Sequence, residues 1–386
     1  MKKSHKLLCI LLALVMVVGL LPGMAFAADV EEAEPAEVAA VDAEASGILD
    51  SLGNYLVYCK LSNKLPAAYA EITLTNQATG ATKTYTANAL GLALIPKGLF
   101  AGDLMAVYTV SATCDGPVTG LQYKSLPGLT WTSGSKLDSA TLVLYPVLTI
   151  GLNYEDHFSY MVGYPNGTVQ PDGSITRAEA ATIIYRMMTD ESRAKYGTKS
   201  NPFTDVNVGN WCNNAVSTLY NAGVINGRSP TTFDPQGLIT RAEFSAMVGR
   251  MFSVTYTGGD SFADLNGNWA SQYINLLAKL GIMKGDDKGN ANPNDNITRA
   301  ETAAMVNRLL GRLPVSDSAD SCTGKVTTWP DNPKSAWYYG DIMEATNSHN
   351  YTWTMETSNV LGDDTVLCEK WTSIRTDAPD WVALQK

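Results

Sequence analysis

Three stretches of the chain repeat the same five residues, Ile-Thr-Arg-Ala-Glu: SITRAEAATIIYRMM (174–188), LITRAEFSAMVGRMF (238–252) and NITRAETAAMVNRLL (296–310). A proline lies six residues before each arginine, and a glycine lies eight residues before each proline. The arginines are Arg177, Arg241 and Arg299, the prolines Pro171, Pro235 and Pro293, and the glycines Gly163, Gly227 and Gly285. Because chance does not preserve both offsets in three copies, the spacing indicates an internal structural repeat.

The threonine and glutamate of each stretch are typical of a helix N-terminus. The threonine hydroxyl can accept a free backbone N–H of the first turn, and the glutamate three residues later can reach back, which forms a capping box. Apolar residues then recur at helical spacing, so we expect a helix after each motif. The predicted pairs are Thr176 with Glu179, Thr240 with Glu243, and Thr298 with Glu301. This role accounts for the glutamates, and we do not interpret them as catalytic.

The arginine between them has no such local explanation. A cation in the first turn faces the positive end of the helix dipole, which costs about 0.3–1 kcal/mol. Three such placements suggest a benefit elsewhere, and a guanidinium group beside free backbone N–H groups would form an anion site. The alternative is a structural ion pair with a neighbouring aspartate or glutamate.

A second element recurs upstream of the motif. FTDVNVGNW (203–211) and FADLNGNW (262–269) each precede a predicted helix that ends at Gly227 or Gly285. WPDNPKSAWYYGDIMEATN (329–347) has the same pattern, but it follows the last motif. Asp205 and Asp264 are predicted to cap or brace the next turn, and Trp211 and Trp269 are predicted to lie in the core rather than to form a ligand platform. Asp331 and Trp337 are the matching residues of the last copy.

The upstream element and the motif are the two halves of one repeat, and the order of these halves along the chain predicts a closed arrangement. The first motif lacks an upstream half, and the spare upstream half stands at the far end of the sequence. We therefore expect residues 329–347 to pack beside residues 151–190, because ring closure buries faces that a lone repeat would expose. The predicted segments are 151–200 (rear half of repeat 1), 201–257 (repeat 2), 258–315 (repeat 3) and 316–386 (closing half-repeat and C-terminal extension).

The region before the repeats has a different character. Residues 1–27 have a basic start, an apolar core and a small-x-small site, as in a cleaved signal peptide. Residues 28–46 are rich in alanine and glutamate and predict a disordered acidic leader. Residues 47–150 contain short runs rich in β-branched and aromatic residues, which predict an all-β sandwich. No later run is long and apolar enough for a membrane span.

Composition excludes several classes of function. The net charge of −10 disfavours nucleic acid as a partner. The chain has three histidines and lacks the common hydrolase and metal-binding motifs, so we expect no enzyme activity, no metal and no cofactor. Cys59 with Cys114 and Cys322 with Cys368 are candidate disulfides, although packing as small buried side chains is equally compatible with the sequence.

The repeats resemble the S-layer homology (SLH) family in its three-repeat form, through the Phe-x-Asp opening, the glycine-containing loop and the Thr-Arg-Ala-Glu helix start. The resemblance implies a mainly α, pseudo-threefold bundle on an exported bacterial surface protein. It also implies non-covalent attachment to a secondary cell-wall polysaccharide, often one with pyruvate ketals. The implied ligand residues are Arg177, Arg241 and Arg299, with Gly163, Tyr164, Gly227 and Gly285 in the loops. Asp286 and Asp287 would repel an acidic ligand at the third repeat.

Residues 47–150 are similar to Cna-B or prealbumin-like domains of surface proteins. That similarity implies a displayed stalk, an adhesive head or a pilin-like subunit, with surface-layer or pilin-like proteins as further partners. A wall-modifying hydrolase carried by this domain is the alternative function.

Overall fold

The computed structural model describes residues 54–63, 65–96, 106–132, 140–312, 318–357 and 365–381. The chain divides into two compact units. Of the described residues, one unit holds most of 54–145 together with 355–357 and 365–367, and the other holds 117–121, 146–354 and 368–381, which include the helices. The predicted signal peptide and acidic leader lie outside the described residues. Among the described residues, we find no helix that is long and apolar enough to cross a membrane.

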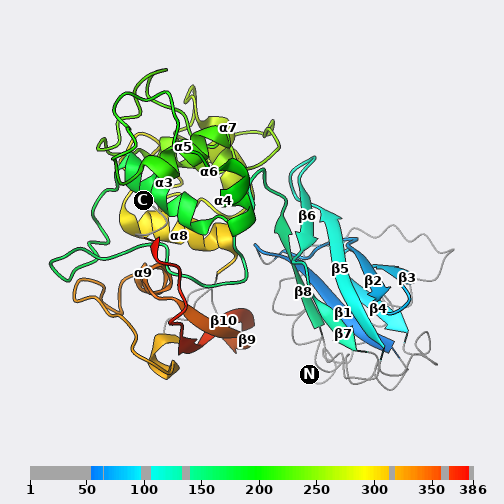
Figure 1. The fold of residues 1–386 in the computed structure, drawn as a ribbon. Coiled ribbons are helices and arrows are strands. Elements are labelled where there is room, and N and C mark those ends of the chain that lie inside the picture. Colours follow the sequence, from blue (N-terminus) through cyan, green and yellow to red (C-terminus); the bar gives the residue numbers. More distant parts are fainter. Residues whose placement is uncertain are drawn as a thin grey trace. The chain divides into compact units, whose positions relative to one another are not determined.

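The first unit is rich in β-structure, as predicted (Figure 1). In β2, Ile72 and Leu74 are buried while Glu71 is exposed, which is the alternation of a sheet with one covered face. Hydrogen bonds connect the strands in the order β3-β2-β5-β6-β8-β1-β4, and β7 pairs with β5. The bounds are β1 (Asn54–Leu61), β2 (Glu71–Asn76), β3 (Thr82–Thr86), β4 (Leu92–Pro96), β5 (Val107–Asp115), β6 (Gln122–Ser125), β7 (Thr130–Thr132) and β8 (Ala140–Pro146). The sandwich arrangement itself stays a prediction.

The second unit is mainly helical (Figure 1). Its helices are α3 (Arg177–Met187), α4 (Asp190–Tyr196), α5 (Asn213–Asn221), α6 (Arg241–Gly249), α7 (Ser271–Lys279), α8 (Arg299–Leu310), the 3₁₀ helix η2 (Ser318–Ser321) and α9 (Tyr339–Thr346). It also holds β9 (His349–Thr357) as far as residue 354 and β10 (Thr365–Ile374) from residue 368. Each motif helix packs against the helix of the following upstream half: α3 against α5, α6 against α7, and α8 against α9. The same helix pair is thus built three times from consecutive segments.

The three motif helices begin as their sequences predict. Helix α3 starts after Thr176, whose hydroxyl accepts the backbone N–H of Glu179, while the Glu179 carboxylate accepts the backbone N–H of Thr176. The same capping box precedes α6 and α8.

The isoleucines just before these caps hydrogen-bond to one another through their backbones in a cycle. The N–H of Ile175 donates to the carbonyl of Ile297, that of Ile297 to Ile239, and that of Ile239 to Ile175. All three side chains are fully buried. The three helix starts therefore meet at one buried point.

The upstream helices end earlier than predicted. Helix α5 ends at Asn221 and α7 at Lys279, well before Gly227 and Gly285. Each helix is followed by a glycine in the left-handed region, with φ +73° at Gly223 and +71° at Gly281. Because this conformation favours glycine, these residues terminate the helices, and the later glycines have another role.

The C-terminal segment contacts both α8 and the beginning of the repeat region. Tyr160 and Met161 donate their N–H groups to the carbonyl of Ala345 in α9, and His349 N–H donates to the carbonyl of His157. Trp371 is buried in a cluster with Tyr339 and Met343 of α9. Trp381 is also buried, and its indole N–H donates to the Ser159 carbonyl at 2.8 Å. The extension is therefore a packed part of the second unit.

The cysteines that can be assessed are reduced in the structure. Cys59, Cys114 and Cys212 are buried free thiols, and Cys322 is partly exposed. Burial raises the pKa of the Cys59 thiol to about 12, and the neighbouring Cys114 makes a smaller contribution to the rise. The Cys368 side chain is not among those described, so the candidate Cys322–Cys368 bridge stays a prediction.

Candidate functional site

The motif arginines are buried, and each reaches into the loop of the next repeat. Arg177 is 4% exposed; its Nε donates to the carbonyl of Phe233 at 2.8 Å, and one terminal nitrogen donates to the carbonyl of Asn226 at 2.8 Å. Arg241 and Arg299 make the equivalent bonds to Ala291 and Lys284, and to Val169 and Val162. The order is cyclic, because Arg299 of the last repeat bonds to the loop of the first.

These bonds give the arginine a structural role that the sequence did not reveal. In each case Nε satisfies a buried backbone carbonyl, whose loss of its donor would cost about 1–3 kcal/mol, and a terminal nitrogen bonds a second, partly buried carbonyl. The remaining nitrogen faces a capping-box glutamate of the next repeat: Arg177 lies 3.5 Å from Glu243, and Arg241 lies 2.6 Å from Glu301. The structural ion pair considered as an alternative is therefore present at both arginines.

The aspartates of the upstream halves hold the same loops from the other side. The Asp205 carboxylate accepts the N–H groups of Phe233 and Asp234, at 2.9 and 2.7 Å. Asp264 accepts from Ala291 and Asn292. Asp331, from the spare upstream half, accepts from Val169 and Gln170 of the first loop.

The loop glycines are required by close packing. A Cβ on Gly227 would lie 2.4 Å from the Ser229 carbonyl oxygen and 2.5 Å from the Phe203 ring. Gly285 faces Phe262 in the same way, and Gly163 faces Trp329. Each glycine thus lies against the first aromatic residue of an upstream half.

We expect Gly227→Ala to lower the free energy of unfolding by about 1–3 kcal/mol, because the added methyl group overpacks this contact. Thermal or chemical unfolding monitored by circular dichroism would measure the change. The matched control is Gly209→Ala, where the nearest atom would lie at 3.4 Å and the backbone is not left-handed. Equal stability of the two variants would contradict the packing role of Gly227.

A pocket of about 360 Å³ lies where the buried arginine of the first repeat meets the second loop. Its lining residues are Arg177, Asn226, Gly227, Arg228, Glu243, Met247, Arg250 and Trp269. The lining thus contains three guanidinium groups and one carboxylate. Burial lowers the pKa of Arg177, while Glu243 raises it; an arginine nevertheless keeps its charge at neutral pH.

Arg228 is the most accessible cation of this pocket, with a side chain that is 42% exposed. It pairs with Asp234 at 2.7 Å and with Glu243 at 3.0 Å. These pairs hold the guanidinium group at the mouth of the pocket.

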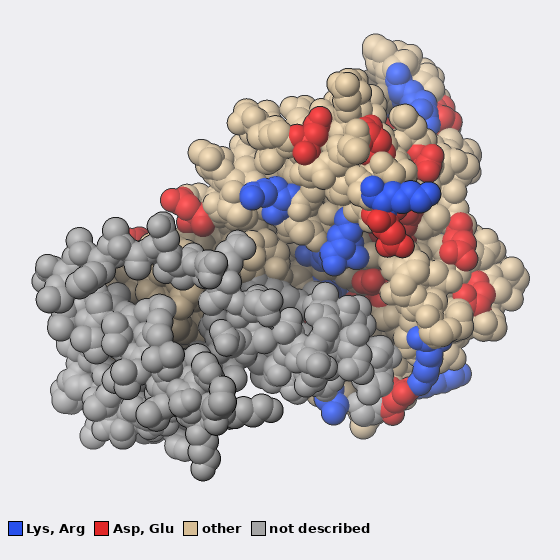
Figure 2. All heavy atoms as spheres, turned by 180° about the vertical axis from the view of Figure 1, so that it is seen from behind, with Lys and Arg blue, Asp and Glu red and all other residues tan. Residues whose placement is uncertain are grey.

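On the face shown in Figure 2, Lys and Arg side chains lie close to Asp and Glu side chains. Positive charge on this face is therefore local rather than spread over a wide field.

Arg250 belongs to a second set of recurring arginines that the sequence analysis missed. Arg186, Arg250 and Arg308 each follow a motif arginine by nine residues. Each donates to the backbone carbonyl 26 residues earlier, that of Tyr160, Val224 or Ile282. The signal was present in the three quoted stretches, where this arginine keeps its position.

The recurring tryptophans are exposed, so the core prediction for Trp211 and Trp269 was wrong. Trp211, Trp269 and Trp337 are 47%, 58% and 65% exposed. Trp269 lines the pocket. A packing requirement in the core therefore does not explain why the repeats share this residue.

The other two repeats replace Arg228 with different residues. Tyr164 takes its place in the first loop, where the Arg299 guanidinium lies 4.8 Å from the centre of its ring. Asp286 takes its place in the third loop, where backbone and side-chain N–H groups lower the pKa of its carboxyl group to about 2. The third loop therefore presents a negative charge where the second presents a positive one.

A separate cluster could hold a metal ion. His157, Glu344, His349 and Glu369 each offer a ligand atom, and these atoms lie within 4.8 Å of one another. Burial and the nearby Arg312 lower the pKa of His157 to about 4, while Glu344 opposes them.

Comparison with known proteins identifies the repeat region. A family model described as "S-layer homology domain" matches residues 159–181, 202–245 and 261–303. Three segments of the second unit thus match the S-layer homology domain, in the region that holds the three motifs. The family resemblance proposed from the sequence is confirmed.

Curated relatives point in the same direction. The chain is 34% identical over 212 residues to Cell surface glycoprotein 1 and 31% identical over 202 residues to Cellulosome-anchoring protein, both of Acetivibrio thermocellus. Each match covers 51% of this chain, but only 9% and 44% of the relatives. An Amylopullulanase of Thermoanaerobacterium thermosulfurigenes is 33% identical over 140 residues, 35% of this chain and 7% of that protein. The family match and these relatives confirm a bacterial cell-surface location and support cell-wall anchoring. Similarity to this chain is also found in an enzyme, the Amylopullulanase.

Proposed function

We propose that the second unit anchors the chain non-covalently to an anionic wall polysaccharide, and that the pocket at Arg228 and Trp269 is its principal ligand site. The observation that carries this proposal is the joining of three guanidinium groups with an exposed indole ring in one pocket. A carboxylate accepts two parallel N–H bonds from a guanidinium group, and the indole can cover the apolar face of a sugar ring.

A pyruvate ketal suits this pocket chemically. It places a carboxylate and a methyl group on one carbon attached to two sugar oxygens. Arg228 and Arg250 would face the carboxylate, and Met247 and Trp269 offer apolar surface to the methyl group and the ring. Arg177 lies in the lining as a fixed positive charge. We propose Arg241 and Arg299 for the same role in the equivalent grooves.

The three grooves differ in their expected affinity for such a ligand. The second loop contributes Arg228, the first contributes Tyr164, and the third contributes Asp286. An acidic sugar would therefore bind most tightly beside Arg228 and least tightly beside Asp286, because a carboxylate near a second carboxylate is repelled.

We also propose that residues 151–347 form one pseudo-threefold module with the predicted repeat boundaries, closed by residues 329–347. The cyclic bonds of the isoleucines, arginines and aspartates support this closure. The first unit, which we propose to be a Cna-B-like sandwich, would be the part displayed from the wall.

Binding to purified wall polysaccharide, before and after mild acid removal of ketal groups, tests the anchoring proposal. Arg228→Ala should weaken binding roughly 10- to 100-fold, because a charge-assisted hydrogen bond contributes about 1.5–3 kcal/mol. Trp269→Ala should weaken it to a similar degree. Trp337→Ala, at the equivalent position of the last upstream half, is the matched control and should change the affinity less than threefold.

Circular dichroism would first establish that each variant is folded. The proposal fails if the ketal-free polymer binds as tightly as the native polymer. It also fails if Arg228→Ala and Trp269→Ala together leave the dissociation constant within twofold of its original value.

A further inference from the structure

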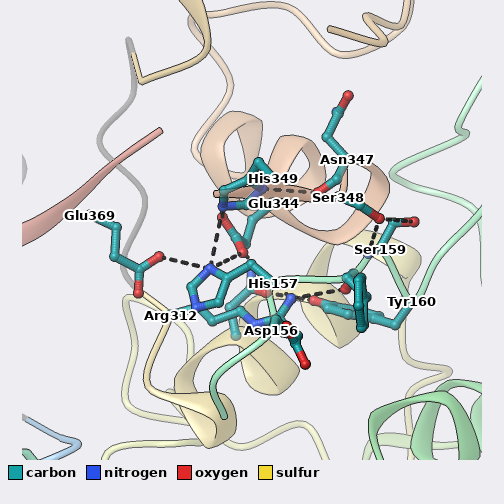
Figure 3. A network of polar contacts seen from close by, with 12 residues as sticks. Asp156, His157, Ser159, Tyr160, Arg312, Glu344, Asn347, Ser348, His349 and Glu369 are labelled. Atoms are coloured by element: carbon teal, nitrogen blue, oxygen red, sulfur yellow. Dashed lines mark hydrogen bonds and ion pairs between the residues drawn. The ribbon is translucent and has the colours of Figure 1, made fainter. Parts of the chain in front are cut away.

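Four buried side chains from separate segments converge at the C-terminal end of the second unit (Figure 3). His157 precedes the first loop, Glu344 lies in α9, His349 begins β9 and Glu369 lies in β10. Each is at most 2% exposed. Neither the arginine–carbonyl bonds nor the wall-binding pocket involves them.

The ligand atoms of this cluster face one another at short range. Nδ1 of His157 lies 3.1 Å from Oε1 of Glu344, 3.3 Å from Oε2 of Glu369 and 3.3 Å from Nε2 of His349. Nε2 of His349 lies 3.3 Å from Oε2 of Glu344. Figure 3 shows both imidazole rings and both carboxylates turned toward the same point.

Surrounding groups fix the orientation of these side chains. Nδ1 of His349 lies 3.0 Å from the carbonyl oxygen of Asn347. A carbonyl can only accept, so Nδ1 carries the proton, and Nε2 of the neutral ring presents its lone pair to the cluster. Trp371 stacks on this ring at 3.9 Å and donates its indole N–H to Glu344 at 3.2 Å. A histidine held by a backbone carbonyl on its outer nitrogen is typical of metal ligands.

The distances are close to those between the ligands of one metal ion. Zinc binds histidine nitrogen and carboxylate oxygen at about 2.0–2.2 Å, so tetrahedral ligand atoms lie about 3.3–3.6 Å apart. His157 Nδ1 lies 3.1 Å from one oxygen of Glu344 and 3.3 Å from the other two ligand atoms, and His349 Nε2 lies 3.3 Å from the second oxygen of Glu344. Because one ligand atom from each residue lies within 4.8 Å of the others, small side-chain movements would bring all four to one ion. We propose that His157, Glu344, His349 and Glu369 bind one divalent transition-metal ion, with zinc as the best fit.

Charge and ligand type support a cation at this point. Two carboxylates are buried together with two imidazole rings, and Arg312 lies 3.5 Å from Glu344. Because burying a carboxylate is costly unless its charge is compensated, a divalent ion between the two would stabilise the pair. Imidazole nitrogen favours zinc or a neighbouring transition metal over calcium or magnesium, which prefer oxygen ligands alone. This site would replace our expectation that the chain holds no metal.

The proposed ion would act as a structural clamp. Its ligands join the segment that leads into the first repeat to α9 and to both C-terminal strands. Because all four proposed ligands are buried, an ion bound by all of them in tetrahedral geometry would have no open coordination position for a substrate. The ion would therefore stabilise the closure of the repeat module, independently of any wall polymer.

Metal analysis of the purified full chain tests the proposal. The chain would be produced without a polyhistidine tag and examined by inductively coupled plasma mass spectrometry. We expect about one zinc ion per chain, and a melting temperature that falls by roughly 10 °C after denaturation and refolding with a chelator. Adding Zn²⁺ should restore it. Co²⁺ in place of zinc should give the intense visible absorption of a tetrahedral site.

Variants distinguish binding at this site from adventitious binding. Glu369→Gln and His349→Gln should each lower the metal content at least tenfold. Glu155→Gln, an equivalent change at an exposed glutamate two residues from His157, should leave it unchanged. If the refolded wild-type chain has the same melting temperature with and without Zn²⁺, and holds less than about 0.1 ion per chain, the proposal is wrong. Zinc retained by Glu369→Gln and His349→Gln would also overturn it.

Discussion

A chain that ends at residue 315 is expected to lose the cooperative unfolding transition of its helical unit. The truncation removes α9 and the buried side chains of Ile342, Met343 and Trp371. Each large buried side chain contributes about 2–5 kcal/mol, and a whole domain is stable by only about 5–15 kcal/mol. Their combined loss would exceed the stability of the module. Circular dichroism and differential scanning calorimetry would measure it.

Point variants test closure of the module without removing buried apolar side chains. Asp331→Asn removes the carboxylate that accepts the N–H groups of Val169 and Gln170. It should cost about as much stability as Asp205→Asn, which acts at the equivalent place inside the repeats. Asp320→Asn, at an exposed aspartate, should cost little. An unchanged melting temperature of the truncated chain would refute the closed arrangement.

Replacing Arg177 with methionine is expected to destabilise the module by roughly 3 kcal/mol, although the sequence marks this arginine as a ligand residue. Methionine fills much of the same space but leaves the carbonyls of Phe233 and Asn226 without their donor, at about 1–3 kcal/mol each. For a unit of this size, the melting temperature should fall by roughly 10 °C.

Arg228→Met is the matched comparison, because the two arginines line the same pocket. Arg228 is 42% exposed, and exposed ion pairs contribute about 0–1 kcal/mol, so its loss should barely change stability. Equal unfolding free energies for the two variants would contradict the buried role of Arg177. The comparison also bears on binding, because lost wall binding by Arg177→Met can follow from unfolding, whereas the same loss by Arg228→Met cannot.

The helical repeats could be predicted from the sequence because their signals are local. A capping box needs only a threonine and a glutamate three residues apart, and both halves of each repeat recur at readable spacing. The positions of Thr176 and Glu179 therefore predicted where α3 begins. The β-rich character of the first unit was equally readable from its composition.

The roles of the arginines and tryptophans could not be predicted in the same way. The partners of Arg177 are backbone carbonyls some 50 residues away, and backbone groups leave no trace in a pattern of side chains. Trp269 was assigned to the core because large apolar residues usually are, yet its surroundings depend on the packing between repeats. His157 and Glu344, two of the proposed metal ligands, are 187 residues apart in the sequence, so no short motif could contain both.

The hydrogen bond from the Trp381 indole to the Ser159 carbonyl has an architectural consequence. It places the last described residue of the helical unit next to the segment that leads into the first repeat. A structure with adjacent ends can be spliced into a surface loop of a host protein without stretching that loop. The unit could thus be transplanted as an internal cassette, and its first and last segments could be joined and the chain reopened between α4 and α5.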